Sequence, residues 1–355
     1  MERLLEMLSY TRAHQSEGER LFVDKFINPY NPKVYKTGNE VLAYVVTVGG
    51  KKRPPVLWSS HVDTVHGKDD PVMQTVVYDE SGGFAYKDDG RPLGADDGAG
   101  VWLMLEMIDA KVAGTYIFHR GEERGGIGSS GMALHHKSWL SQFKWAIAFD
   151  RRGDSDIITE QSPGVCASDD FAKKLAMLIN EGTGLTYEGS PNGIFTDTAN
   201  YRRLIPECTN LSVGYDNEHT GSETLDTWHL MNLRNAMIRF TADMTNSLPA
   251  TRDHTAPDPV PLYGKYGGYG VWDTWNYKLP ATKKKKAARA VNVADNIMDW
   301  SADDVTQMRF NDLVKLVREA HPEDVAGLIV RLAEDVQYVS EQYYEATGEE
   351  SSSYT

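Results

Sequence analysis

The chain has 355 residues, of which 41% are hydrophobic, and this length allows one large α/β domain with an appended segment. Its formal net charge of −14 argues against a general binder of nucleic acid or of anionic membranes. The two cysteines cannot form a disulfide framework, and they fit a reducing compartment. Because we recognise neither a secretory signal nor an apolar run of about 18 residues, we expect a cytoplasmic protein without a membrane anchor.

The spacing of apolar residues predicts the first elements of the chain. Spacings of three to four residues are typical of helices, whereas alternation or a short continuous apolar run is typical of strands. The expected elements are two helices over residues 2–14 and 17–27, and two strands over residues 34–48 and 55–60. The second strand ends beside His61. A stretch rich in glycine and aspartate, residues 67–91, predicts a hairpin on the surface.

From residue 94 onward, strands and helices alternate regularly. Ser168 can cap one of the helices, and the acidic pair that follows it suits the helix dipole. The expected helices cover residues 98–110, 131–139, 168–179 and 225–244, and the expected strands cover 115–119, 144–149, 156–159 and 209–215. This alternation predicts an α/β three-layer sandwich, in which helices cover both faces of a mainly parallel, mixed sheet. In such a sheet, ligands gather at the carboxyl ends of the strands.

The composition changes after Leu248, so we take residues 1–248 as one domain. Residues 249–300 are rich in proline, glycine, aromatic residues and lysine, and they predict a linker or a strap on the domain. Aromatics beside lysines can also stack on nucleic acid, but the acidic balance favours strap packing. Residues 301–347 predict a helical hairpin that packs on the domain or on another subunit, as in a homo-oligomer. A disordered tail is expected over 348–355.

Two adjacent acids, Asp96 and Asp97, lie in the turn Gly94-Ala95-Asp96-Asp97-Gly98 between a strand and a helix. Hydrolysis by two metal ions needs a carboxylate that bridges ions about 3.5–4 Å apart, further ligands on each side, and a base that is not coordinated. A tight turn can hold such a carboxylate, and the charge of the ions offsets the repulsion between the two acids. Taken alone, Asp-Asp-Gly is more often an ordinary turn or helix cap.

A second acidic pair, Glu122 and Glu123, follows a buried strand. Adjacent residues at the end of a strand point in different directions, so one glutamate can bind a metal while the other faces the reacting water. Metal-assisted hydrolysis requires this division of roles. Taken alone, a pair of glutamates is usually a solvated edge.

The remaining candidate ligands are His61, Asp150 and His219. His61 shares a face of its strand with Asp63, which could orient the imidazole. Asp150 ends an apolar strand, and pairing with the arginines at 151–152 is the competing interpretation. His219 lies in a loop before the last long helix. Each residue has an ordinary structural explanation, but together and in this order they predict a two-metal hydrolytic site.

Five segments thus carry the candidate ligands His61, Asp96, Glu123, Asp150 and His219. In this order they resemble those of the co-catalytic di-zinc exopeptidase clan. This clan includes leucyl and glutamyl aminopeptidases, peptidase T and the aminoacylase-like carboxypeptidases, and the similarity covers residues 1–248. The resemblance implies two Zn²⁺ ions, with Co²⁺ or Mn²⁺ as alternatives at a carboxylate-rich site. It assigns one ion to His61, Asp96 and Asp150, and the other to Asp96, Glu123 and His219.

The same resemblance assigns further roles. Asp96 would bridge the two ions and would be joined to Asp97 by a cis peptide bond. Glu122 would be the general base, and Asp63 would stand behind His61. In segment 195–206, Asp197 and Tyr201 are candidates to face the substrate, with a helix cap and a core aromatic as the alternatives.

The intervals between the ligands indicate the branch of the clan. The interval between His61 and Asp96 is too short for the barrel that glutamyl aminopeptidases insert. The interval between Asp150 and His219 has the patterns of core strands and helices, which leaves no room for the lid of the carboxypeptidases and aminoacylases. The chain is therefore most similar to the compact aminopeptidase branch.

The expected activity is hydrolysis of an N-terminal peptide bond by a metal-dependent aminopeptidase. One alternative is a deacylase that acts on N-acyl amino acids and recognises their carboxylate through Arg124, Arg151 or Arg152. A second alternative is a non-catalytic structural or assembly protein that retains the site and works through its C-terminal hairpin.

Overall fold

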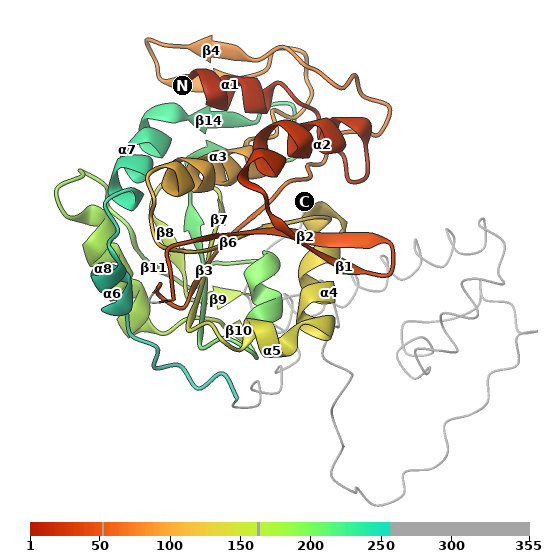
Figure 1. The fold of residues 1–355 in the computed structure, drawn as a ribbon. Helices are drawn as coiled ribbons and strands as arrows, with labels where there is room; N and C mark the ends of the chain where they lie inside the picture. The colour runs from red at the N-terminus through yellow and green to blue at the C-terminus, as the bar shows by residue number, and fades with distance from the viewer. Residues whose placement is uncertain (52, 162–163, 256–355) are drawn as a thin grey trace, which may run out of the picture. The chain divides into compact units, whose positions relative to one another are not determined.

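The computed structural model describes residues 1–51, 53–161 and 164–255 (Figure 1). The helical hairpin and the tail expected at the carboxyl terminus, and the strap from residue 256 on, lie outside the described residues and stay predictions. Within the described part of the chain, no helix is both long enough and apolar enough to cross a membrane.

The centre of the fold is a mixed sheet of eight strands in the order β1-β2-β6-β3-β7-β12-β8-β11. Its strands are β1 (Lys33–Thr37), β2 (Glu40–Val48), β3 (Val56–His61), β6 (Gly114–His119), β7 (Trp145–Arg151), β8 (Asp156–Ile158), β11 (Glu188–Ser190) and β12 (Glu207–Ser212). The four central strands β6, β3, β7 and β12 are parallel, whereas β1, β2 and β6 pair antiparallel at one side, as do β12 and β8. The predicted sheet, mainly parallel but mixed, is confirmed.

Alternate residues of the central strands enter two different apolar clusters. Trp58 and Phe118 belong to one cluster, whereas their neighbours Leu57 and Ile117 belong to the other. Successive side chains of a strand point to opposite faces, so the sheet is buried on both sides. This explains why the sequence of β3 is a continuous apolar run rather than an alternating one.

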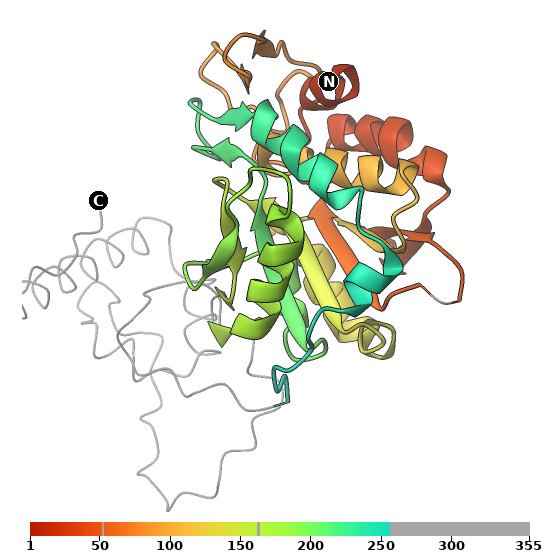
Figure 2. The same cartoon turned by 90° about the vertical axis from the view of Figure 1, so that its left-hand side faces the viewer.

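Helices cover both faces and complete the three layers (Figures 1 and 2). On one face lie α1 (Glu2–Leu8), α2 (Glu17–Phe22), α3 (Ala95–Asp109), α6 (Asp169–Asn180), α7 (Thr227–Met237) and α8 (Ala242–Asn246). On the other face lie α4 (Ile127–His135), α5 (Lys137–Leu140) and the short helix η4 (Asp197–Tyr201). The α/β three-layer sandwich expected from the sequence is therefore present.

A second, smaller sheet lies beside the main one. It has the order β13-β14-β5-β4, with β4 (Val77–Asp79), β5 (Phe84–Tyr86), β13 (Tyr215–Asp216) and β14 (Thr224–Asp226). The antiparallel pair β4–β5 is the hairpin predicted over residues 67–91. Because β5 pairs with β14, this hairpin supports the loop between β13 and β14, which carries His219.

Two of the expected helices are shorter than their apolar spacing suggested. The helix expected over residues 2–14 ends at Leu8, because Tyr10 and Ala13 instead form β-bridges with Met73 and Thr64. The single helix expected over residues 225–244 is two helices, since Thr241 caps a new one by accepting the N–H of Met244. By contrast, the predicted cap at Ser168 is confirmed, because its side chain accepts the N–H of Phe171.

The contact between α3 and β7 leaves no room for a side chain at Gly100. A Cβ added there would lie 2.0 Å from the carbonyl oxygen of Phe149 and 2.3 Å from Oδ1 of Asp97. We expect Gly100→Ala to lower the free energy of unfolding by about 1–3 kcal/mol, because helix and strand must separate. Denaturant unfolding measures the change.

Gly50→Ala is the matched control, since no atom of the described residues lies within 4 Å of a Cβ at Gly50. If both variants unfolded at the same denaturant concentration, the close approach of α3 to β7 would not be real.

Candidate metal centre

All five predicted ligands lie at the carboxyl edge of the parallel strands. His61 is the last residue of β3, Asp150 is the second-to-last residue of β7, and Glu123 lies in the short helix η3 (Glu122–Arg124) that follows β6. Asp96 lies at the start of α3, and His219 lies in the loop between β13 and β14. The fold thus collects residues that are far apart in the sequence.

The carboxylate of Asp96 lies between two imidazoles. Its Oδ1 atom is 3.1 Å from Nε2 of His61, and its Oδ2 atom is 3.0 Å from Nε2 of His219. Each oxygen thus faces a different histidine. A carboxylate that bridges two metal ions needs this arrangement, with one oxygen and one further ligand on each side.

One more acid completes each side. Oδ1 of Asp150 is 3.3 Å from Nε2 of His61, and Oε1 of Glu123 is 3.1 Å from Nε2 of His219. The structure therefore brings together two groups of three residues that share Asp96. The resemblance assigned the same residues to two metal ions, and this role as ligands stays a prediction.

The donor set fits a small divalent ion on each side. Ligand atoms around a tetrahedral zinc ion lie about 3.3 Å apart, given metal–ligand distances of about 2.0–2.2 Å, and the contacts at Asp96 are close to this separation. Oε1 of Glu123 is buried and accepts no hydrogen bond from the described part of the chain, although Nε2 of His219 lies 3.1 Å away. Imidazole nitrogen with carboxylate oxygen suits zinc, cobalt or manganese.

Asp97 supports the ends of two ligand-bearing segments. The peptide bond between Asp96 and Asp97 is cis, as the resemblance implied. The Asp97 carboxylate accepts the backbone N–H of His61 at 3.1 Å and that of Gly100 at 3.0 Å. It therefore ties the end of β3 to the first turn of α3.

Two hydroxyl groups hold Asp150 in place. The Thr196 hydroxyl donates to Oδ2 at 2.6 Å, and the Tyr215 hydroxyl donates to Oδ1 at 3.1 Å. These bonds use Asp150 as an acceptor, and no sequence pattern indicated either one.

The arginines that follow Asp150 in the sequence pair with other acids. Arg151 binds Asp156 at 3.0 Å, and Arg152 lies 3.4 Å from Glu218. The competing interpretation of Asp150, pairing with its neighbours, is therefore not what the structure shows.

Asp63 supports both His61 and the acidic pair. Nδ1 of His61 donates to the backbone carbonyl of Asp63 at 2.9 Å, whereas the carboxylate of Asp63 is 3.9 Å away. The carboxylate instead accepts the N–H of Gly121 at 2.7 Å and that of Glu122 at 3.2 Å. The imidazole is therefore oriented by the main chain, and the carboxylate positions the segment that carries Glu122.

The loop of His219 has an unusual backbone. His219 has φ +65° and Asn217 has φ +55°, so two residues with side chains adopt the left-handed conformation within three positions. Such conformations cost free energy for residues other than glycine and gather at functional sites. The His219 side chain is half-exposed, unlike the buried His61.

The crowding of acids in the centre changes their affinity for protons. Burial raises the pKa of Asp150 to about 6 and that of Glu123 to about 7. Burial also raises the pKa of Glu122 well above its usual value, and the charges of Asp150 and Asp197 add to the effect. A bound cation would reverse these shifts, because it stabilises ionised carboxylates.

A buried network lies under the centre and joins the two candidates for substrate contact. His119 has Nδ1 3.1 Å from Oδ2 of Asp197 and Nε2 2.5 Å from the hydroxyl of Tyr201. Asp197 is 1% exposed and Tyr201 is 0% exposed, so neither faces solvent. Tyr201 is thus a core aromatic, which was the alternative left open for it. His119 was missed, because its position at the end of β6 gives no sign of partners that lie much later in the sequence.

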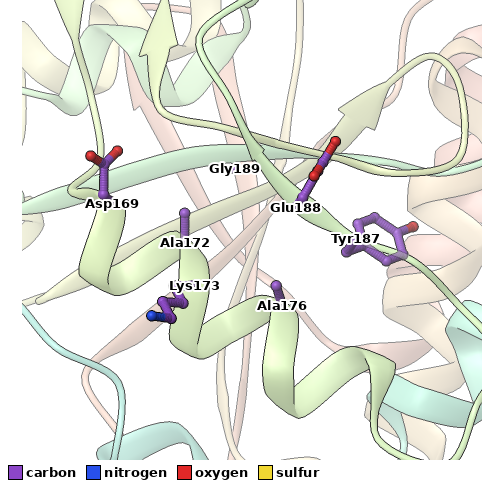
Figure 3. A pocket seen from close by; sticks show the side chains of 7 residues that line it. All are labelled: Asp169, Ala172, Lys173, Ala176, Tyr187, Glu188 and Gly189. Carbon is purple, nitrogen blue, oxygen red and sulfur yellow. The ribbon is translucent and has the colours of Figure 1, made fainter.

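A hollow of about 380 Å³ lies between α6 and the edge strand β11 (Figure 3). Its lining residues are Asp169, Ala172, Lys173, Ala176, Tyr187, Glu188 and Gly189. None of them is one of the predicted site residues, so this hollow is separate from the candidate metal centre.

Together, the α/β fold and the set of nitrogen and oxygen donors are typical of a metal-dependent hydrolase. The model of Peptidase family M28 matches residues 43–227, just over half of the chain, and the chain belongs to this family. It is therefore a metallo-exopeptidase. The match includes all five candidate ligands, as well as Glu122 and Asp63.

Solved structures of similar fold include two bacterial peptidases. The aminopeptidase PepT of Bacillus cereus is 15% identical, with 68% of this chain and 97% of that chain covered and a TM-score of 0.56. A tripeptidase of Staphylococcus aureus is 16% identical, with 69% and 97% covered and a TM-score of 0.56. A TET aminopeptidase of a marine sediment Thaumarchaeota archaeon is 12% identical, with 69% and 98% covered and a TM-score of 0.51. A search of curated proteins found no match.

The comparisons confirm the resemblance to the co-catalytic zinc exopeptidase clan. They also favour an enzyme over the non-catalytic assembly protein that the sequence left open.

Proposed function

We propose that this protein is an aminopeptidase that removes N-terminal residues from peptides with a pair of zinc ions. His61, Asp96 and Asp150 would hold one ion, and Asp96, Glu123 and His219 would hold the other. The position of Asp96 between two imidazoles carries this proposal, because a single-metal site has no use for a carboxylate shared in this way. The names of the PepT and TET structures also support it.

Bound metal ions would supply a Lewis acid for the scissile carbonyl and lower the pKa of the attacking water. Glu122 takes a proton from this water and returns it to the leaving amine, so that hydroxide adds to the carbonyl carbon and the C–N bond breaks. Asp63 holds the backbone N–H of Glu122 and thereby fixes where the base stands.

We expect Glu122→Gln to lower kcat by about 10²- to 10⁴-fold, because an amide cannot accept the proton of the water. Metal content should stay the same, since Glu122 is not among the proposed ligands. Steady-state kinetics and elemental analysis of the same preparation measure both quantities.

Two controls separate the base from its neighbours. Glu123→Gln removes a proposed ligand, so it should lose metal as well as activity, whereas the exposed Glu80→Gln should change neither. Turnover near the wild-type value in Glu122→Gln would show that another group is the base.

A deacylase with the same metal ions is the second candidate function. A deacylase must bind the free carboxylate of an N-acyl amino acid, and Arg124, Arg151 and Arg152 were its candidates. Of these, Arg151 and Arg152 lie beside Asp156 and Glu218. Arg124 is exposed and directly follows the proposed ligand Glu123, so it is the arginine that favours this alternative.

Substrate panels distinguish the two functions. We expect hydrolysis of aminoacyl-nitroanilides and of peptides with a free amino terminus, and no hydrolysis of N-acetylated peptides or N-acyl amino acids. Arg124→Ala should then leave kcat/KM for nitroanilides unchanged, since these substrates have no carboxylate. Preferential hydrolysis of N-acyl amino acids, abolished by Arg124→Ala, would establish the deacylase instead.

Zinc is the proposed ion, with Co²⁺ and Mn²⁺ as alternatives that the same nitrogen and oxygen ligands accept. A cytoplasmic location also stays a prediction, as does a homo-oligomer formed through the C-terminal helices.

A further inference from the structure

The backbone turn that delivers Asp96 is held by two buried charged residues with no role so far. Arg12 follows α1 and is 0% exposed, and Glu223 precedes β14 and is 2% exposed. They come from segments that are far apart in the sequence, and they meet the same stretch, residues 93–96. A buried charge is retained only where its hydrogen bonds are satisfied, so their partners show what they do.

The guanidinium of Arg12 joins two ligand-bearing segments. Its Nε atom donates to the carbonyl of Val62 at 2.9 Å, and its Nη2 atom donates to the carbonyl of Gly94 at 2.8 Å. Val62 directly follows the ligand His61, and Gly94 lies two residues before Asp96. Because the guanidinium is planar and rigid, it fixes the distance between these two carbonyls in a way that a lysine ammonium cannot.

Arg12 is itself held firmly. Its backbone N–H donates to Thr64 at 3.2 Å, and its carbonyl accepts the N–H of Thr64 at 2.9 Å. The guanidinium also lies over the ring of Phe22, 4.7 Å from the ring centre. The position of the planar fork of N–H donors that the guanidinium forms is therefore set by α2 and by the segment after β3.

Glu223 acts on the same turn from the loop of His219. One carboxylate oxygen accepts the N–H of Leu93 at 2.9 Å and that of Gly94 at 3.0 Å, and the other accepts the N–H of Asp96 at 3.0 Å. His219 lies only four residues before Glu223. The carboxylate therefore ties the His219 loop to the backbone of the bridging residue.

We propose that Arg12 and Glu223 are positioning residues of the metal centre, which hold the turn at residues 93–96 so that Asp96 faces both His61 and His219. Arg12 sets the turn relative to His61, and Glu223 sets it relative to His219. Arg12 bonds the backbone of Val62 and Gly94, and Glu223 bonds the backbone of residues 93–96, so both act through the position of this turn. This inference rests on the proposed two-metal function.

The chain contains a matched control for Glu223. Glu207 is also a buried carboxylate that accepts three backbone N–H groups, from Ser168, Thr251 and Arg252, at 2.7, 2.8 and 3.0 Å. It lies at the first residue of β12, at the opposite edge of the sheet from the metal centre. Replacing either glutamate by glutamine introduces an amide N–H that faces backbone donors, so both variants lose stability for the same reason.

The experiment measures Co²⁺ binding to the full-length, metal-depleted protein by competition with a chelator, together with the absorption spectrum of bound Co²⁺. We expect Glu223→Gln to weaken binding about 10- to 100-fold and to change the spectrum, as for other groups that orient metal ligands. Glu207→Gln should lower the melting temperature but leave both the affinity and the spectrum at wild-type values. Equal weakening in the two variants, or none in Glu223→Gln, would overturn the proposal.

Arg12→Lys is the second test, and it keeps the charge while removing the planar fork. We expect it to weaken Co²⁺ binding and change the spectrum, whereas Arg234→Lys, which alters the pairing of Arg234 with Glu106 on α3, should not. Wild-type Co²⁺ binding in Arg12→Lys would contradict the role of the fork. Failure of the wild-type protein to bind two Co²⁺ ions would instead contradict the two-metal function itself.

Discussion

Asp96 shares its two carboxylate oxygens between His61 and His219, and the arrangement of the whole site depends on this contact. The histidines come from different sheets, one at the end of β3 and the other in the loop between β13 and β14. The carboxylate must therefore be placed by backbone that is fixed to both sheets. The start of α3 meets this requirement, because Asp97 ties it to the end of β3 and Glu223, directly before β14, accepts the backbone N–H of Asp96.

Burying so many carboxylates is unfavourable unless positive charge is close. In the protein itself, Arg12 supplies a buried positive charge that interacts with Asp63, Asp96 and Asp97. Two divalent ions would supply the remaining positive charge. They would also lower the raised pKa values of the acids, so that the acids bind the ions as carboxylates. The divalent ions that would offset the buried negative charge would thus be the same ions that assist peptide hydrolysis.

Four of the ligands could be predicted from the sequence because each lies at the end of a recognisable strand or at the start of a recognisable helix, whereas His219 was predicted in a loop. Parallel topology then places them at one edge without further information. The contacts that fix their geometry could not be predicted in this way. Glu223 and Arg12 meet the turn before Asp96 only after folding, and nothing local distinguishes them from surface charges. The break in the helix expected over residues 225–244 was also missed. The apolar spacing continues through the break, so it hides the new helix that Thr241 caps.

Metal stoichiometry and position test the central claim most directly. A crystal of the zinc-loaded protein, measured at the zinc absorption edge, should show two anomalous peaks per chain, about 3.5–4 Å apart, on either side of the Asp96 carboxylate. Elemental analysis should give two zinc ions per chain. A single peak bound by His61 alone or by His219 alone, with Asp96 bound through one oxygen, would contradict the bridging role and the mechanism built on it.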